Sequence, residues 1–142
     1  MARDFLSKQY NEVELFDQCS TACEDAETNN LVNNNVYRPK KCRMQDYSFE
    51  ENEKLNGIYL RWCIGYLKRE EQIKFLKKAK QALDNNRVVF SRRTGPPSYI
   101  ILLDNVDDQV DRKNRLMIDK QEVQTEEYYE KLFIEADLTI FK

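Results

Sequence analysis

The sequence LRWCIGYL, at residues 60–67, is an apolar run that reaches a glycine and leads directly into a charged segment. The apolar side chains of residues 57–64 fall on both sides of an extended chain, which is typical of a buried strand in a parallel sheet. Residues 70–83 repeat apolar side chains at helical spacing with lysines opposite, and this pattern predicts an amphipathic helix. We expect residues 84–86 to end that helix and Arg87–Phe90 to form the next strand. A strand, a helix and a strand in this order predict a parallel βαβ unit.

Related patterns lie on both sides of this unit. Glu12–Asp17 predicts a strand with an acidic end, and Ser20–Asn30 predicts a helix with Ser20 as its N-cap. Tyr37–Met44 reads as an irregular or short extended segment. Glu126–Ala136 places apolar side chains on one helical face, which predicts a further helix. Alternating strands and helices favour an α/β protein.

Composition and charge exclude several classes of protein. The 142 residues are enough for one domain, and 41% of them are hydrophobic, which favours a folded chain. The net charge of −2, with scattered Lys and Arg, gives no basic face for nucleic acid. No apolar run approaches the roughly 20 residues that span a bilayer, and the N-terminus lacks the core of a signal peptide. We expect a cytoplasmic or nuclear protein without a membrane or nucleic-acid partner.

The chain has four cysteines and no histidine. The cysteines form no paired C-x-x-C pattern, so buried free thiols are expected rather than disulfides or a zinc site. Without histidine, neither a Ser-His or Cys-His nucleophile nor a His-containing zinc site can be built. The acidic run 104–108 has no second acidic cluster at suitable spacing, and we expect no metal site. Proton transfer must therefore use Asp, Glu, Tyr, Lys or water.

Two segments resemble the protein α-N-terminal methyltransferases. YLRWCIGYL at residues 59–67 is similar to the family sequence I-x-x-Q-W-C/V-I-G-H-L, and FLKKAKQAL at residues 75–83 is similar to its F-L-K-R-x-K-x-x-L helix. The match is specific because the tryptophan, the glycine and the helix residues agree in register. Those enzymes use S-adenosylmethionine to methylate the α-amino group of proteins beginning Xaa-Pro-Lys. The resemblance implies this cofactor, a protein N-terminus as substrate, and a Rossmann-like class I methyltransferase sheet with flanking helices.

The resemblance also implies which residues bind the cofactor. Asp17 ends a segment that resembles the second strand of the family, whose carboxylate bonds the ribose hydroxyls. Met44 and Gln45 begin MQDY, which resembles the L-Q-D-F that packs on and bonds to the adenine. Arg61 stands where the family has a glutamine, near the positions of the sulfonium and the substrate amine. These four residues are the expected cofactor set.

The substrate and catalytic residues follow in the same way. Trp62 matches the tryptophan of the family, and Arg93 stands where an asparagine in K-E-N or K-D-N, at the end of the strand after the helix, holds the substrate amino terminus. Tyr66 replaces a histidine that, with an aspartate, positions and deprotonates the amine; a tyrosine side chain, with a pKa of about 10, can still hydrogen-bond. Asp107 in DDQVDR resembles that aspartate in D-S-S-V-T-R and is the preferred acid. Glu122 is the rival, from DKQE placed on L-D-K-E-D.

We expect one partial methyltransferase domain over residues 1–142, with an insertion or long loop at 94–122. The first strand of the family and its G-x-G-x-G turn would precede Arg3, and its C-terminal hairpin would follow Phe141. A sheet lacking both exposes strand edges, which a partner protein would cover. Two functions stay open: an active S-adenosylmethionine-dependent methyltransferase, or a catalytically inactive pseudo-methyltransferase that acts as a structural or regulatory subunit of a complex.

Overall fold

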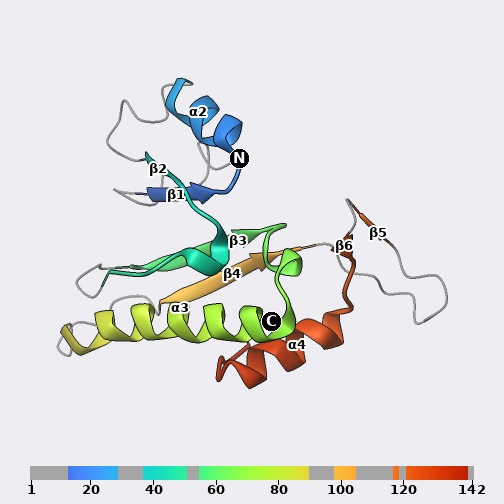
Figure 1. Ribbon diagram of the computed structural model, residues 1–142. Coiled ribbons are helices and arrows are strands. Elements are labelled where there is room, and N and C mark those ends of the chain that lie inside the picture. The colour runs from blue at the N-terminus through green and yellow to red at the C-terminus, as the bar shows by residue number, and fades with distance from the viewer. Residues whose placement is uncertain are drawn as a thin grey trace. The chain divides into compact units, whose positions relative to one another are not determined.

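The computed structural model describes residues 13–28, 37–50, 55–89, 98–104, 117–118 and 121–140 (Figure 1). The chain divides into two compact units, residues 1–47 and residues 48–142. Each unit contains a pair of parallel strands joined through a helix. This is the α/β pattern that the sequence predicts.

The first unit is built from β1 (Val13–Asp17), α2 (Ser20–Thr28), β2 (Tyr37–Lys41) and the 3-10 turn η1 (Met44–Asp46). β1 and β2 are parallel and in register from Val13 beside Tyr37 to Asp17 beside Lys41. The predicted strand and helix are therefore confirmed, and the segment predicted to be irregular or extended forms β2. The sequence also predicts a short helix at Arg3–Tyr10 and a turn at Asn33–Asn35, and both segments lie outside the described residues.

The predicted N-cap of α2 is one residue too late. The Cys23 amide donates to the Cys19 carbonyl at 3.3 Å, so the first helical hydrogen bond begins at Cys19 and Ser20 is already inside the helix. The Cys19 amide in turn donates to Asp17 Oδ1 at 2.8 Å. The Asp17 side chain, at the end of β1, therefore accepts a backbone hydrogen bond at the start of this helix.

Tyr47 fixes the segment after β2 against β1. Its buried ring stacks on Phe16 with 4.4 Å between centroids, and its hydroxyl donates to Glu14 Oε1 at 2.6 Å. The Cys42 amide also donates to the Asp17 carbonyl at 2.9 Å. These contacts hold η1 at the carboxyl ends of the two strands.

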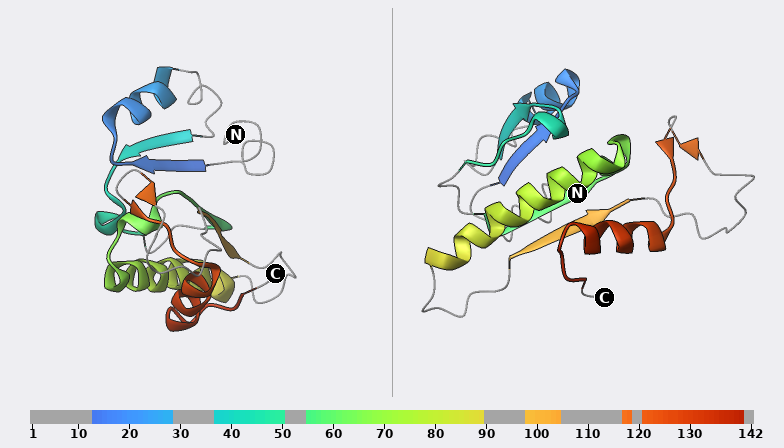
Figure 2. Two further views of the ribbon diagram at one scale, coloured as in Figure 1. Left: turned by 90° about the vertical axis from the view of Figure 1, so that its right-hand side faces the viewer. Right: turned by 60° about the horizontal axis from the view of Figure 1, so that its bottom comes forward.

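The second unit contains β3 (Gly57–Arg61) and β4 (Tyr99–Leu103), which are parallel and in register from Gly57 beside Tyr99 to Arg61 beside Leu103. The buried strand predicted at residues 57–64 is confirmed as β3, although it ends at Arg61. Figures 1 and 2 show α3 (Arg69–Val89) along one face of this pair. The sheet-and-helix unit predicted from LRWCIGYL is thus present, with a different second strand.

The prediction that Arg87–Phe90 is a strand is wrong, because residues 87–89 continue α3 and the next described strand is β4. Asp84, Asn85 and Asn86 are only moderately poor helix formers, so they do not stop a helix. The residues that are poorly suited to a helix are Gly95, Pro96 and Pro97, which lie shortly before β4 in the sequence. The segment 94–122, expected as an insertion or long loop, contains β4 and two short antiparallel strands, β5 (Met117–Ile118) and β6 (Gln121–Glu122).

The core of the second unit is formed by buried side chains of β3, of α3 and of α4 (Glu126–Glu135), and the two helices pack side by side (Figures 1 and 2). Thr125 caps α4, because its side chain accepts a hydrogen bond from the Tyr128 amide. Both predicted apolar helix faces are confirmed. Their buried members are Phe75, Leu76, Ala79 and Leu83 on α3, with Tyr129, Leu132 and Ala136 at α4.

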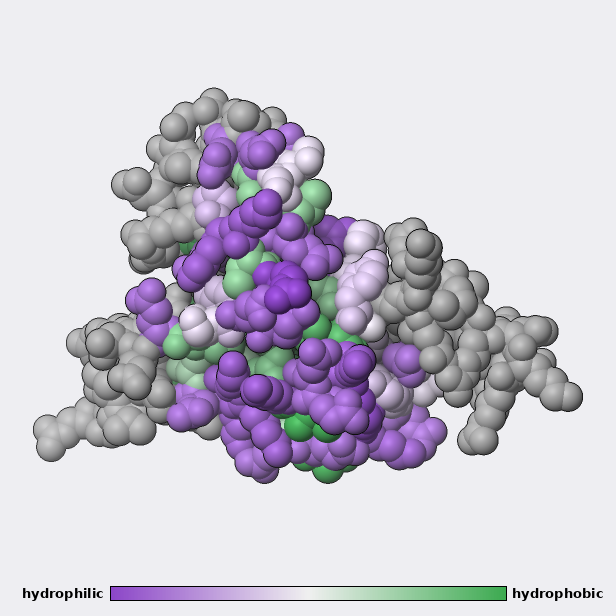
Figure 3. All heavy atoms as spheres, viewed as in Figure 1, coloured by the Kyte–Doolittle hydropathy of each residue, from purple (hydrophilic) through white to green (hydrophobic). Residues whose placement is uncertain are grey.

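The surface seen in Figure 3 is mostly hydrophilic over the described residues, with small hydrophobic areas between charged side chains. All four cysteines are free thiols, as predicted, but the prediction that they are buried is wrong: Cys19 is exposed and the other three are half-buried. None of the helices in the described ranges is long and apolar enough to cross a membrane.

Candidate functional site

Three of the predicted cofactor residues lie at one edge of the first unit. Asp17 ends β1, and Met44 and Gln45 lie in η1, three and four residues after β2 ends. The carboxyl ends of adjacent parallel strands share one edge of a sheet, where α/β proteins bind nucleotides. Asp17 and Gln45 are exposed and Met44 is buried. To bind an adenosine, a site needs a hydrogen-bond acceptor for the ribose diol, and an amide and an apolar side chain for the base. Asp17, Gln45 and Met44 supply these three groups.

Arg61 and Trp62 lie at the equivalent edge of the second unit: Arg61 ends β3 and Trp62 follows it. The Trp62 amide donates to the Leu103 carbonyl at 2.9 Å, although Trp62 has a φ of 50°, a conformation that costs a residue with a side chain roughly 1–2 kcal/mol. Its indole is 53% exposed, with the Arg61 guanidinium 4.1 Å from the ring centroid. A large aromatic held in a strained backbone conformation at the surface is typical of a binding site.

Tyr66 lies next to this edge, in the 3-10 turn η2 (Ile64–Tyr66). Ile64 is fully buried and anchors the turn, whereas the Tyr66 side chain is 57% exposed. Strand β6, which ends at Glu122, approaches η2 with Cα atoms within 8 Å. The structure therefore brings the backbone of the rival acid, Glu122, close to the turn that carries Tyr66.

Asp107 and Arg93 lie outside the described residues. The argument for Arg93 depended on a strand at Arg87–Phe90, but residues 87–89 belong to α3. The described strand after the helix is β4, and Asp104 and Asn105 follow it in the sequence. The two letters D-N after β4 match the end of the family's K-D-N, and the apolar run YIILL before them is the sequence signal for this strand.

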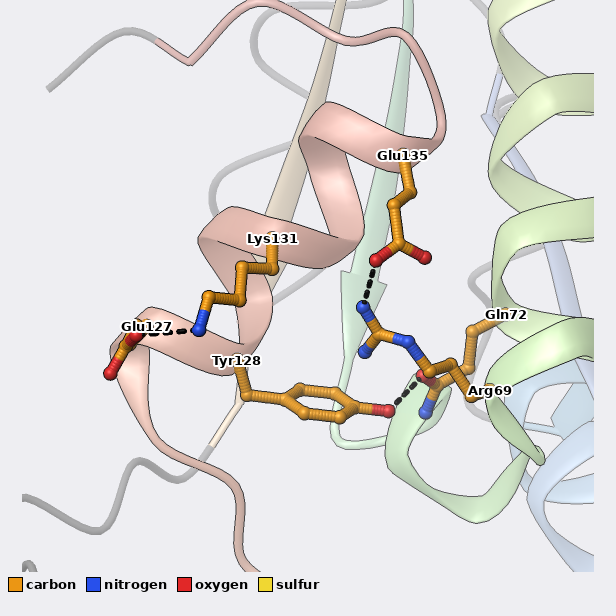
Figure 4. Close-up of polar contacts among 6 residues, drawn as sticks. All are labelled: Arg69, Gln72, Glu127, Tyr128, Lys131 and Glu135. Carbon is orange, nitrogen blue, oxygen red and sulfur yellow. Dashed lines mark hydrogen bonds and ion pairs between the residues drawn. The ribbon is translucent and has the colours of Figure 1, made fainter.

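A hydrogen-bonded group that sequence reasoning also missed joins α3, α4 and η2 (Figure 4). Gln72 is 2% exposed; its Nε2 donates to the Ile64 carbonyl at 3.0 Å, and its Oε1 accepts from the Tyr128 hydroxyl at 2.7 Å. Arg69 lies over the Tyr128 ring and pairs with Glu135 at 2.7 Å. The detectable signal was Gln72 itself, a polar residue on the apolar face of an amphipathic helix.

Tyr129, the neighbour of Tyr128 on α4, donates from its hydroxyl to Asp104 Oδ2 at 3.0 Å. Burial raises the pKa of this phenol above its ordinary value of 10.0, and the nearby Asp104 carboxylate raises it further. The folded chain thus holds this proton more tightly than the unfolded chain does. The resulting stability is complete below about pH 10 and is lost as pH rises above that value toward the folded-state pKa.

We therefore expect the Tyr129→Phe variant to lose less of its free energy of unfolding than wild type as pH rises above about 10. The wild-type free energy of unfolding should fall more steeply above about pH 10 than that of the variant, because only the wild type must release the buried proton. Urea denaturation of both proteins, repeated from about pH 8 to about pH 11, measures the two slopes. Equal slopes would contradict the assignment.

In the described part of the chain, no group of three or more Cys, Asp or Glu side chains is arranged to hold a metal ion. The predicted site residues fall into two sets. Asp17, Met44 and Gln45 lie together in the first unit, and Arg61, Trp62, Tyr66 and Glu122 lie in the second.

Comparison with known proteins gives one family. The family model for the AdoMet dependent proline di-methyltransferase matches residues 1–142. The chain is 24% identical to Alpha N-terminal protein methyltransferase 1 of Oryza sativa subsp. indica, over 99% of this chain and 43% of that protein. It is 27% identical to the protein of the same name from Dictyostelium discoideum, over 100% of this chain and 48% of that protein. The chain spans about half the length of these relatives, and the resemblance that the sequence suggested is confirmed: the chain belongs to the AdoMet dependent proline di-methyltransferase family.

Proposed function

We propose that this chain forms part of a methyltransferase that transfers the methyl group of S-adenosylmethionine to the α-amino group of a protein N-terminus. The observation that carries the proposal is the family match over every residue, and the names of the relatives point to the same substrate class. The exposed Trp62 beside the Tyr66 turn supports a surface site open to a peptide end. We propose further that both units belong to one methyltransferase domain.

The proposed cofactor residues are Asp17, Met44, Gln45 and Arg61. Asp17 would accept from the ribose hydroxyls, and Met44 and Gln45 would contact the adenine, because Asp17 ends β1 and the other two residues follow the parallel strand β2. Arg61 is included because it aligns with the glutamine of the family that lies near the position of the sulfonium. S-adenosylmethionine, when bound, supplies an electrophilic methyl group, and the side chains supply its position.

The substrate amine sets the chemical task. An α-amino group has a pKa of about 8, so a large part of it is protonated at neutral pH, and only the neutral form can attack a methyl group. Trp62 is proposed to contact the peptide, and Tyr66 to orient the amine by a hydrogen bond. Glu122 is proposed as the acidic partner in place of Asp107, because β6 approaches η2. Asn105 takes the role first given to Arg93, because it follows the strand after the helix.

The experiment that tests the function has two parts. Calorimetry with S-adenosylmethionine should show micromolar binding to the chain, and mass spectrometry should detect a methylated peptide that begins Xaa-Pro-Lys. No binding at millimolar cofactor, or no methyl transfer, would overturn the proposal. The same peptide with a blocked α-amino group is the control, because its amine cannot accept the methyl group.

A pair of matched variants tests the acidic partner. Glu122→Gln should lower the rate of methyl transfer about a hundredfold while cofactor affinity is unchanged, since it removes a proton acceptor and leaves the residues after β1 and β2 intact. Asp107→Asn, the same chemical change at the rival position, should leave the rate within about twofold. The opposite pattern would return the role to Asp107.

The inactive pseudo-methyltransferase is not favoured by the family match or by any contact among the described residues. A partner protein covering strand edges, and a cytoplasmic or nuclear location, remain predictions from the sequence.

A further inference from the structure

The buried amide of Gln72 occupies an unusual position for a polar side chain. It lies on the apolar face of α3, near the buried Phe75 and Leu76, and is itself only 2% exposed. Burying an amide is costly unless both its donor and its acceptor are bonded. Here both are: Nε2 donates to the Ile64 carbonyl and Oε1 accepts from the Tyr128 hydroxyl. An apolar side chain of the same volume would fill the space without either bond, so the amide carries a specific geometric constraint.

One end of this bridge holds the turn that presents Tyr66. The Ile64 carbonyl also accepts from the Leu67 amide at 3.1 Å, so it receives two hydrogen bonds. Ile64 is fully buried and Tyr66 is exposed two residues later. A shift of the carbonyl would therefore turn the Tyr66 side chain, because only Gly65 separates the two residues within the 3-10 turn η2.

The other end of the bridge holds the start of α4. Tyr128 lies in the first turn of that helix, where its amide donates to the Thr125 carbonyl at 3.1 Å and to Thr125 Oγ1 at 3.2 Å. Arg69, from the first turn of α3, covers the Tyr128 ring with 4.7 Å to the centroid. Glu122 ends β6 only six residues before Tyr128. The bridge, whose Gln72–Tyr128 bond is drawn in Figure 4, thus connects the helix that follows the Glu122 strand to the turn of Tyr66.

We propose that Gln72 is a positioning residue: with Tyr128 it sets the spacing between the Tyr66 turn and the Glu122 strand, the two elements that face the substrate amine. This inference rests on the proposed function. Gln72 acts through the Ile64 carbonyl and touches neither the substrate nor the cofactor. Small displacements of groups that orient a reacting amine cost large factors in rate, so the bridge determines kcat more than affinity.

The test compares Gln72→Met, Tyr128→Phe and the double variant with wild type. Gln72→Met keeps the volume but removes both bonds, and it should lower kcat about tenfold to a hundredfold while KM for S-adenosylmethionine stays within about twofold. Tyr128→Phe should have a smaller effect in the same direction. The double variant should be no slower than Gln72→Met, because the Tyr128 hydroxyl acts through Gln72. Gln81→Met, the same change at an exposed position of α3, is the control and should match wild type.

A second readout does not depend on activity. Trp62 is the single tryptophan of the chain and lies two residues before Ile64, so its fluorescence reports on this turn. Gln72→Met should change the quenching of Trp62 by acrylamide at temperatures where the variant is still folded, and Gln81→Met should not. The positioning role would be overturned if folded Gln72→Met protein had the wild-type kcat. It would also be overturned if the losses of kcat in Gln72→Met and Tyr128→Phe added up in the double variant. If wild type transfers no methyl group, the proposed function fails, and the effect of Gln72 on catalysis fails with it. If Gln72→Met leaves the quenching of Trp62 unchanged, the claim that Gln72 fixes the conformation of the η2 turn is overturned as well.

Discussion

Replacing Leu76 by alanine is expected to destabilise the second unit by about 3 kcal/mol, within the range of about 2–5 kcal/mol found for buried leucine truncations. Leu76 is fully buried on α3, one turn after Gln72, whose side chain bonds Tyr128 of α4, so the change removes apolar contacts and leaves a cavity. Urea denaturation followed by circular dichroism measures the difference in the free energy of unfolding.

Lys78→Ala is the matched control for this truncation. Lys78 lies two residues further along α3, on its exposed side, and alanine is a better helix former than lysine. Its variant should therefore unfold within about 0.5 kcal/mol of wild type. If Leu76→Ala were no less stable than Lys78→Ala, the packing of α3 against α4 would be wrong.

Replacing Tyr66 by histidine is expected to raise the rate of methyl transfer about a hundredfold near pH 7.5, the lower end of the range for general-base catalysis. The position is exposed on η2 and close to the backbone of β6. An imidazole titrates at about 6.5 and a phenol at about 10, so only the imidazole is a competent base at this pH. The gain should disappear as pH falls below about 6.5, because the imidazole becomes protonated.

Two further variants sharpen this prediction. Tyr66→Phe removes only the hydroxyl and should lower the rate, since the proposed hydrogen bond to the amine is lost. Tyr99→His places an imidazole at the start of β4, beside Gly57 at the opposite end of the strand pair, and should leave the rate unchanged. A gain from Tyr99→His equal to that from Tyr66→His would show that the effect is unrelated to the η2 turn.

The strands and helices with strong periodic patterns could be predicted from sequence. β1, β3, α3 and α4 lie where alternating or helical spacing placed them, because burial of one apolar face selects the same period in the sequence and in the fold. The end of α3 could not be predicted, since three weakly unfavourable polar residues are a poor stop signal inside a long helix. The error carried over to Arg93, whose role depended on where the next strand ends.

The residues of the candidate site could also be predicted only in part from the sequence. Trp62 and Tyr66 were found because they stand in a register shared with a family, and their exposure fits the expected roles. The spacing favours Asp107 over Glu122, because a valine and an arginine follow Asp107 at the offsets of the family, but Asp107 lies outside the described residues. The proposal of Glu122 rests on the approach of β6 to η2, which brings together segments more than fifty residues apart.

The sequence by itself determined the family, the α/β class, and the stretch LRWCIGYL as the place where a strand turns toward a helix, because local period and register are properties of neighbouring residues. Only the tertiary structure decided that Trp62 is exposed with a left-handed backbone, that β4 is the partner of β3, and that Gln72 and Tyr128 join η2 to α4. These features depend on which distant segments meet when apolar faces are buried and on which polar atoms must then find partners.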